Sequence, residues 1–359
     1  MADLTLSLKP DLEAATQRWL AFWAHELTDR PVTTIRTPRE GVERVGGPPY
    51  MAGLTGEWDA LLDQILANLQ ATYWAGDAIP HYVPSFGPDQ MAAFAGARLV
   101  TPEESGNYGT NWVEACIDDW AKQLPLRVDD DNYWWSRMIA FYEALAAKLD
   151  GHAVLAHLDL HSNFDLLLAL RGGERLCLDL LDTPDLVDAA LDSANALYAP
   201  VYDRLYEAGR MDHTGTLGWV TAYHPERTNT IQCDFAALIG PRQFDRWAAS
   251  ALAAEAEHLG RCVYHLDGPE CLVHLESICA VPGLECIQWT TGARNAAFPE
   301  WIDLLQRIQS LGVAVWIPCS AAEIPFYHRQ LKPHLVWYDA WAPSEREADE
   351  MLEWLVANT

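Results

Sequence analysis

Two short histidine and aspartate clusters are the residues best suited to chemistry. The first contains His157, Asp159 and His161, and the second contains His265 and Asp267. In an extended strand, side chains two residues apart point to the same face, so each cluster would present its imidazole and carboxylate groups together. Such groups bind a divalent metal or act as an acid and base pair. We expect His265 and Asp267 to be metal ligands, and Asp159 and His161 to be catalytic.

Each cluster also has a purely structural interpretation. Asp159 and His161 could lie in a loop and hydrogen-bond the chain that follows, and Asp267 could cap the next helix. Cys319 is a third candidate metal ligand, because a thiolate opposite His265 would favour zinc. A free cysteine is, however, more often a small buried hydrophobic residue.

Other polar and aromatic residues follow predicted strands, where a substrate could reach them. Asp234 is a further catalytic candidate. The candidates for substrate binding are Trp219, Tyr223, Gln288, Trp289 and Asp339. Each of these residues could equally cap a helix or form part of the rim of the fold.

Alternating strands and helices must position these residues. Short apolar runs predict strands at 78–85, 153–159, 213–220, 230–234, 262–267, 284–289, 313–319 and 335–339. Helices that begin at proline and end at glycine separate many of them. Such a series of βα units predicts an α/β fold, a (β/α)8 TIM-type barrel, with its active site at the carboxyl ends of the strands. A doubly wound sheet is the alternative, but no GxGxxG follows an early strand.

The domain organisation follows from the same pattern. We expect residues 1–75 to form an N-terminal helical extension packed on the barrel. Residues 76–359 would form the barrel itself, with a helical insertion around 110–150. No Ser/Gly-rich linker separates a second domain.

The composition excludes several partners. There are 51 acidic and 24 basic residues, a formal net charge of −27, which would repel phosphate backbones and anionic lipid. We therefore expect no nucleic-acid or membrane partner. No apolar run reaches the roughly 18 residues that a membrane span needs. The eight cysteines are sparse over 359 residues, so we expect reduced thiols and a cytoplasmic protein. None forms the CxxC pair of common structural zinc sites.

Several longer motifs resemble the uroporphyrinogen decarboxylase superfamily over residues 75–359. They lie at 165–174, 178–185, 232–235, 264–268 and 287–289. The superfamily has a (β/α)8 barrel fold. The chain looks more like its zinc-dependent methyltransferases, which move methyl groups between corrinoid proteins and thiols, than like true decarboxylases. The N-terminal arginines do not match the motif with which the decarboxylases bind their polycarboxylate substrate.

The resemblance implies a metal site with one altered ligand. The methyltransferases hold zinc through a His-x-Cys pair and a later cysteine. This chain keeps His265 but has Asp267 in place of the first cysteine, and Cys319 comes one strand earlier than the later cysteine of the family. A carboxylate makes the site harder and less suited to thiolate chemistry. The resemblance thus implies a divalent metal, with zinc favoured, and a corrinoid as methyl carrier on a partner protein.

The leading hypothesis is a zinc-type methyltransferase that acts on a small methylated molecule or a methyl-corrinoid. One alternative is a metal-dependent lyase or hydrolase for a small polar or sugar-like molecule, with Asp234 and Asp267 as paired carboxylates. Another is a non-catalytic barrel that binds a small molecule. The sequence leaves open whether the chain forms a homodimer.

Overall fold

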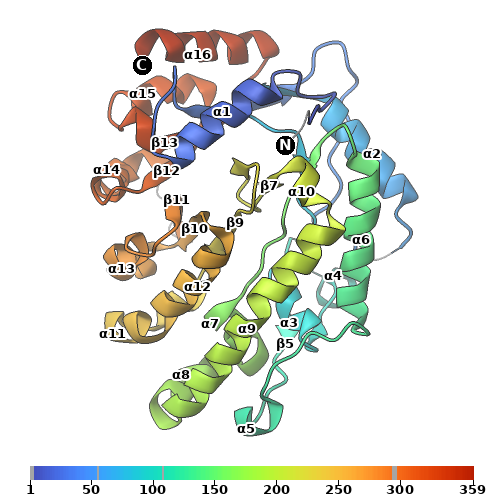
Figure 1. The fold of residues 1–359 in the computed structure, drawn as a ribbon, viewed down its shortest axis with the longest axis vertical. Coiled ribbons are helices and arrows are strands. Elements are labelled where there is room, and N and C mark those ends of the chain that lie inside the picture. Colours follow the sequence, from blue (N-terminus) through green and yellow to red (C-terminus); the bar gives the residue numbers. More distant parts are fainter. Residues whose placement is uncertain (1–3, 55, 107–108, 293–296) are drawn as a thin grey trace.

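A seven-stranded, mostly parallel sheet forms the centre of a mixed α/β fold (Figure 1). The computed structural model describes residues 4–54, 56–106, 109–292 and 297–359. The strands of the sheet are, in spatial order, β2 (Thr72–Gly76), β1 (Val32–Pro38), β13 (Val336–Trp341), β12 (Ala314–Ser320), β11 (Leu284–Thr290), β10 (Cys262–Asp267) and β9 (Asn229–Gln232). Every neighbouring pair is parallel except β1 and β2.

Three two-stranded ladders accompany the sheet. A parallel one joins β3 (His81–Tyr82) to β6 (Val154–Leu155). Antiparallel ones join β4 (Arg98–Leu99) to β5 (Val113–Glu114) and β7 (Thr216–Leu217) to β8 (Tyr223–His224).

Helices surround the strands. They are α1 (Leu12–Trp23), α2 (Asp59–Gln70), α3 (Gln90–Phe94), α4 (Pro102–Ser105), α5 (Trp120–Gln123), α6 (Tyr133–Leu149), α7 (Asn163–Arg171), α8 (Gly173–Asp182), α9 (Pro184–Ala208), α10 (Met211–Thr214), α11 (Pro241–Gln243), α12 (Ala249–Leu259), α13 (Leu275–Cys279), α14 (Ile302–Ser310), α15 (Ile324–His328) and α16 (Glu345–Asn358). Proline begins α9 and α11, where a missing N–H costs nothing. Among the described residues, no helix is long and apolar enough to cross a membrane.

The strands of the C-terminal half lie where the sequence predicts them, as β10 to β13. The predicted closure into a barrel is not detected: over the residues that the structure covers, no ladder joins β1 to β3 or β6 to β9. Pro80 and Pro84 flank β3 and donate no backbone N–H, which keeps its ladder short. Between the chain after β6 and β7, a single backbone hydrogen bond takes the place of a ladder: His157 N donates to Leu217 O at 2.7 Å.

The N-terminal segment differs from its prediction. Residues 1–75 are predicted to be a helical extension, but β1 lies inside the central sheet, between β2 and β13. Its sequence, VTTIRTP, is rich in β-branched residues, which favour strands. The predicted insertion at 110–150 is helical over α5 and α6.

The strands carry two separate apolar cores, one on each face. On the inner face, residues such as Val263, Ala314 and Trp337 pack against α1. The Trp19 ring lies 5.0 Å from that of Trp337, and its indole N–H donates to Asp77 O at 2.9 Å. The outer face belongs to a larger core that includes the surrounding helices. Because the inner-face contacts involve the first residues of the strands, α1 covers their amino ends, and the carboxyl ends remain for a site.

Candidate metal site

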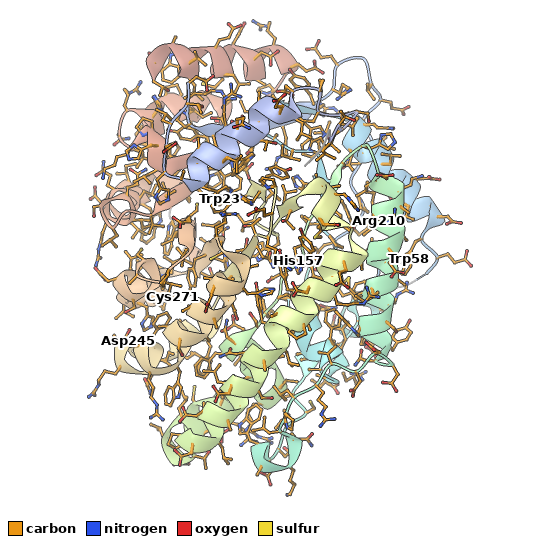
Figure 2. The ribbon with its side chains drawn as sticks, viewed as in Figure 1. Trp23, Trp58, His157, Arg210, Asp245 and Cys271 are labelled. Carbon is orange, nitrogen blue, oxygen red and sulfur yellow. The ribbon has the colours of Figure 1, made fainter. Side chains whose placement is uncertain are left out.

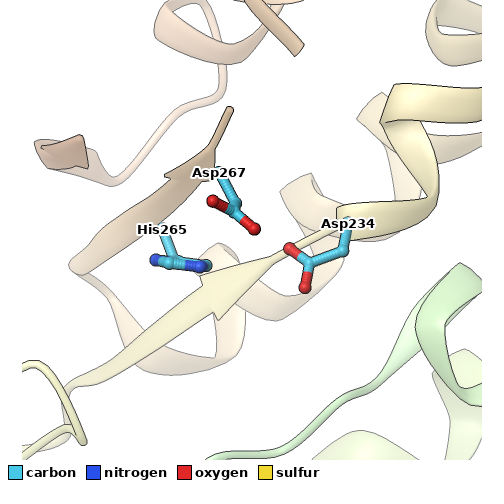
Figure 3. Close-up of side chains that lie close together, drawn as sticks. All are labelled: Asp234, His265 and Asp267. Atoms are coloured by element: carbon cyan, nitrogen blue, oxygen red, sulfur yellow. The ribbon is translucent and has the colours of Figure 1, made fainter. Parts of the chain in front are cut away.

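Asp234, His265 and Asp267 come together at the carboxyl ends of β9 and β10 (Figure 3). Each offers one ligand atom, and these atoms lie within 4.8 Å of one another. His265 and Asp267 lie on β10, two residues apart and therefore on the same face. Asp234 begins the turn of 3₁₀ helix that follows β9. His265 and Asp267, the predicted metal ligands, thus lie beside Asp234, which the sequence predicts as a catalytic residue.

The backbone around Asp234 is held by Asp165 of α7. The two carboxylate oxygens of Asp165 accept the N–H groups of Asp234 and Phe235, both at 2.9 Å. Burial raises the pKa of Asp165 to about 7, and the nearby Asp234 adds to this shift. Directly after β10, Gly268 has a φ of 81°, a conformation that glycine adopts readily, and it begins the 3₁₀ turn Pro269–His274.

Two neighbours orient His265. Its Nδ1 shares a hydrogen bond with Gln288 Oε1, the paired position on β11. Because a carbonyl oxygen only accepts, Nδ1 carries the hydrogen and Nε2 is left as the free ligand atom. The Trp219 ring stands edge-on to the imidazole at 5.0 Å. The structure therefore brings Gln288 and Trp219, two of the predicted substrate residues, next to His265.

The donor set suits a divalent cation. Two carboxylates and one imidazole are ligands of zinc in catalytic sites and of other first-row metals. Burial raises the pKa of Asp267; His265 opposes the shift and Asp234 adds to it. Like charges this close favour a cation between them. All three side chains are partly exposed, so a fourth ligand can enter from solvent.

Asp159 and His161 form an ion pair beside this cluster. His161 Nε2 lies 3.5 Å from Asp159 Oδ2, and its Nδ1 lies 3.7 Å from Asp89 Oδ1. Burial alone would lower the pKa of His161, but Asp159, Asp89 and further carboxylates raise it to about 10. His161 is therefore an imidazolium at neutral pH. The fields of His265 and Asp234 both act on Asp159, which brings the pair into the same electrostatic site.

Several buried polar atoms around the cluster have no hydrogen-bond partner among the described residues. They are Asp159 Oδ1, Gln232 Oε1 and the indole N–H groups of Trp219 and Trp316. Gln232 is opposite His265 in the ladder of β9 and β10. Trp316 is opposite Gln288 in the ladder of β11 and β12. Unpaired buried atoms are costly, so their gathering around one histidine indicates a place for a ligand.

Cys319 does not join the metal site. On β12, Val315, Ile317 and Cys319 belong to the outer-face core, and Trp316 lies on the inner face. Burial raises the pKa of the Cys319 thiol, which disfavours a thiolate. The structure therefore does not support the prediction that Cys319 is a ligand. Side chains alternate along β12, and that of Cys319 points to the outer face instead of the inner one. Since both faces of β12 carry mostly apolar residues, its sequence does not reveal which face is which.

Three other predicted substrate residues lie away from His265 or are engaged elsewhere. Trp289 faces the outer core, with its ring 4.9 Å from that of Trp301. Tyr223 is fully buried in the α1 core, where its hydroxyl donates to Thr214 O at 3.1 Å. Asp339 lies on the inner face, but its Oδ1 is bound by Arg36 at 2.6 Å and by Thr34 at 2.9 Å.

His157 is a core residue. Its ring is fully buried and stacks on Tyr202 of α9 at a centroid distance of 4.1 Å; Figure 2 shows it beside α9. Burial lowers its pKa to about 4, so it is neutral. The first histidine cluster therefore divides, with His157 in the core and Asp159 and His161 in the site.

Sequence reasoning missed three residues of the site. Asp89, Asp165 and Gln232 come from three separate segments of the chain. Gln232 and Asp165 carried part of the family resemblance, which was the one signal available for them. Asp89 follows Gly87 and Pro88 in a stretch that reads as a loop.

Comparison with known proteins supports the fold. Neither a protein-family model nor a curated protein sequence matches the chain. Among solved structures, the chain is similar to a methyltransferase from Methanosarcina mazei, with a TM-score of 0.60 and 12% identity over 96% of this chain and 98% of that one. A B12-independent methionine synthase from Shewanella sp. W3-18-1 gives a TM-score of 0.47 and 10% identity over 91% and 99%. The chain thus shares its overall α/β fold with a methyltransferase along nearly its whole length.

Proposed function

We propose that this protein is a metal-dependent methyltransferase whose metal, zinc by preference, is bound by Asp234, His265 and Asp267. The convergence of these three side chains at the carboxyl ends of β9 and β10 carries the proposal. The whole-length likeness to a methyltransferase fold supports the choice of reaction. Closure of the strands into a functional (β/α)8 barrel is part of the same proposal.

The residues fit a catalytic rather than a structural metal. Three protein ligands leave a coordination position for substrate, whereas structural zinc sites use four. Gln288 would hold His265 in the tautomer that binds metal, as outer partners of ligating histidines do. The partial exposure of the three ligands gives a substrate access to that position.

A bound divalent metal lowers the pKa of a coordinated thiol or hydroxyl, so that the anion can accept a methyl group. The residues of this chain supply the rest. Asp159 has a free oxygen that can orient a substrate group through a hydrogen bond, and the released proton can pass to solvent at the partly exposed ligands. His161, held as an imidazolium by Asp89 and Asp159, stabilises the negative charge nearby. Trp219 shields one side of His265 from water.

The methyl donor in this proposal is a corrinoid carried by a partner protein or a small methylated molecule. Because α1 covers the amino ends of the strands, such a donor would approach the carboxyl ends. A second copy of this chain, in a homodimer, is a further partner to be tested by its mass in solution.

Metal analysis of protein purified without chelator tests the proposal. We expect about one divalent metal per chain, and a loss of affinity of more than about 100-fold in His265→Ala, since even outer-shell partners contribute about 10- to 100-fold. Cys319→Ala is the matched control and should keep its metal. Methyl transfer from methylcobalamin to a thiol should depend on that metal. Equal and negligible metal in the wild type and in His265→Ala would end the proposal.

A lyase or hydrolase acting on a sugar-like molecule is the second candidate. The pairing of the Asp234 and Asp267 carboxylates favours it, because two such groups can act as acid and base. The burial of Trp289 in the outer core removes one of the flat surfaces that a sugar would need. Turnover of sugars or sugar acids by the metal-loaded protein, with no methyl transfer, would favour this candidate.

A further inference from the structure

The charge of the site exceeds what one divalent metal can neutralise. Four carboxylates, from Asp89, Asp159, Asp234 and Asp267, surround it. The positive charges against them are the His161 imidazolium and the two charges of the metal. Four carboxylates therefore face three positive charges, and two of these carboxylates, Asp89 and Asp159, are largely buried. Carboxylates this close together favour a further cation beside the metal.

Two hydrogen-bond acceptors in the same place lack donors. Asp159 Oδ1 has no partner among the described residues, and neither has Gln232 Oε1. The Gln232 side chain is 2% exposed, and its Nε2 lies 3.4 Å from Asp234 Oδ2. This contact fixes the amide orientation, since the opposite one would turn an oxygen toward a carboxylate. The Gln232 side chain is thus directed into the cluster, and its Oε1 is free to accept a hydrogen bond from a ligand.

We propose that the small-molecule substrate of this site carries a protonated amine, whose N–H groups bind Asp159 and Gln232 beside the metal. A protonated amine supplies both missing features at once, a positive charge and N–H donors. The Trp219 ring next to His265 adds an aromatic surface of the kind that attracts organic cations. The unpaired indole N–H groups of Trp219 and Trp316 leave room for an oxygen on the same molecule, so amino alcohols and amino acids belong to the class.

This inference rests on the proposed metal site but is tested by a separate measurement. Zinc-loaded protein is titrated with dimethylammonium, with its neutral analogue dimethyl sulfide and with acetate, and binding is followed by ligand-observed NMR. We expect dimethylammonium to bind at least about tenfold more tightly than either of the others, because a charge-assisted hydrogen bond contributes about 10- to 100-fold. Equal or tighter binding of dimethyl sulfide or acetate would overturn the inference.

Two variants separate a specific contact from general attraction to an acidic protein. Asp159→Asn should weaken dimethylammonium binding by about 10- to 100-fold and leave the zinc content unchanged. Asp192→Asn removes one charge from an exposed position of α9 and should change nothing. Thermal melting of each variant shows whether it is folded. Equal losses in both variants, or a second zinc bound per chain, would contradict the amine site, whereas a wild type without zinc would contradict the proposed function.

Discussion

His157 and His161 lie four residues apart, yet their surroundings leave the first neutral and the second positively charged. His157 stacks on Tyr202 in the helix-covered core, and burial lowers its pKa to about 4. His161 is also buried, but Asp89 and Asp159 flank it, and the carboxylates raise its pKa to about 10. Burial alone keeps a histidine neutral, whereas burial among carboxylates keeps it charged. One segment therefore places its first histidine in the core and its second at the candidate site.

The largest expected effect is the dependence of stability on alkaline pH. The folded-state pKa of His161 is above its unfolded value, so its contribution is complete below about pH 6.5 and is lost as the pH rises through about 10. Over this window the unfolding free energy of the wild type should fall more steeply than that of His161→Gln, by about 1.4 kcal/mol per pH unit.

Urea denaturation of the metal-free protein at pH 6, 7, 8 and 9 measures this difference. Asp165 and Glu255 have raised pKa values as well, of about 7 and about 8, and they lower stability in the same direction. They remain in His161→Gln, so the comparison of the two proteins isolates most of the His161 contribution. Parallel curves for the two proteins would contradict the assigned charge of His161.

His157 should act over a narrower window with the opposite sign. Its pKa is depressed in the folded state, so its neutral form must take up a proton on unfolding, and stability is lost as the pH falls from about 6.5 to about 4. His157→Phe keeps the stack on Tyr202 but cannot titrate. The variant should lose about 1.4 kcal/mol less per pH unit over this window. Its cost at pH 7 should be about 1 to 3 kcal/mol, since Asn229 loses its 3.2 Å contact with the ring. If both proteins lost the same unfolding free energy between pH 6.5 and pH 4, His157 would already be charged in the core.

A smaller effect is expected at Asp165, which touches the site only through the backbone. Asparagine has one acceptor oxygen, so Asp165→Asn can keep only one of the two bonds to the N–H groups of Asp234 and Phe235. We expect metal affinity to fall by about 10- to 100-fold, as for other outer-shell changes. Isothermal titration with zinc measures it. Glu255→Gln is a matched buried control and should have less effect; the reverse order would show that Asp165 does not orient Asp234.

The smallest effect is expected at Cys319. Since its side chain lies in the outer core, Cys319→Ala should reduce the unfolding free energy by only about 1 kcal/mol, the value of about one buried methylene-sized group. Its zinc affinity should equal that of the wild type. A large loss of zinc with normal stability would restore Cys319 to the metal site.

The sequence predicted β10 well, and with it the shared face of His265 and Asp267, because local signals agree there. Gly260 and Gly268 bound a strand in which His265 and Asp267 interrupt an apolar run at a spacing of two. The face of Cys319 could not be read, because both faces of β12 are apolar. The roles of Asp89 and Asp165 could not be predicted from local patterns, for another reason. Their roles depend on contacts with residues 72 and 69 positions away in the chain, which no local pattern encodes.

The position of helix α1 determines how molecules can enter and leave the candidate site. The helix fills the amino ends of the strands with Trp19, Phe22 and Trp23, which leaves the carboxyl ends as the route to the candidate metal site. In the proposed methyltransferase, substrate, methyl donor and product would all use this route. The product would have to leave by this route before the next substrate molecule enters, so product and substrate should compete for binding. In the proposed enzyme, product release can then limit the turnover rate.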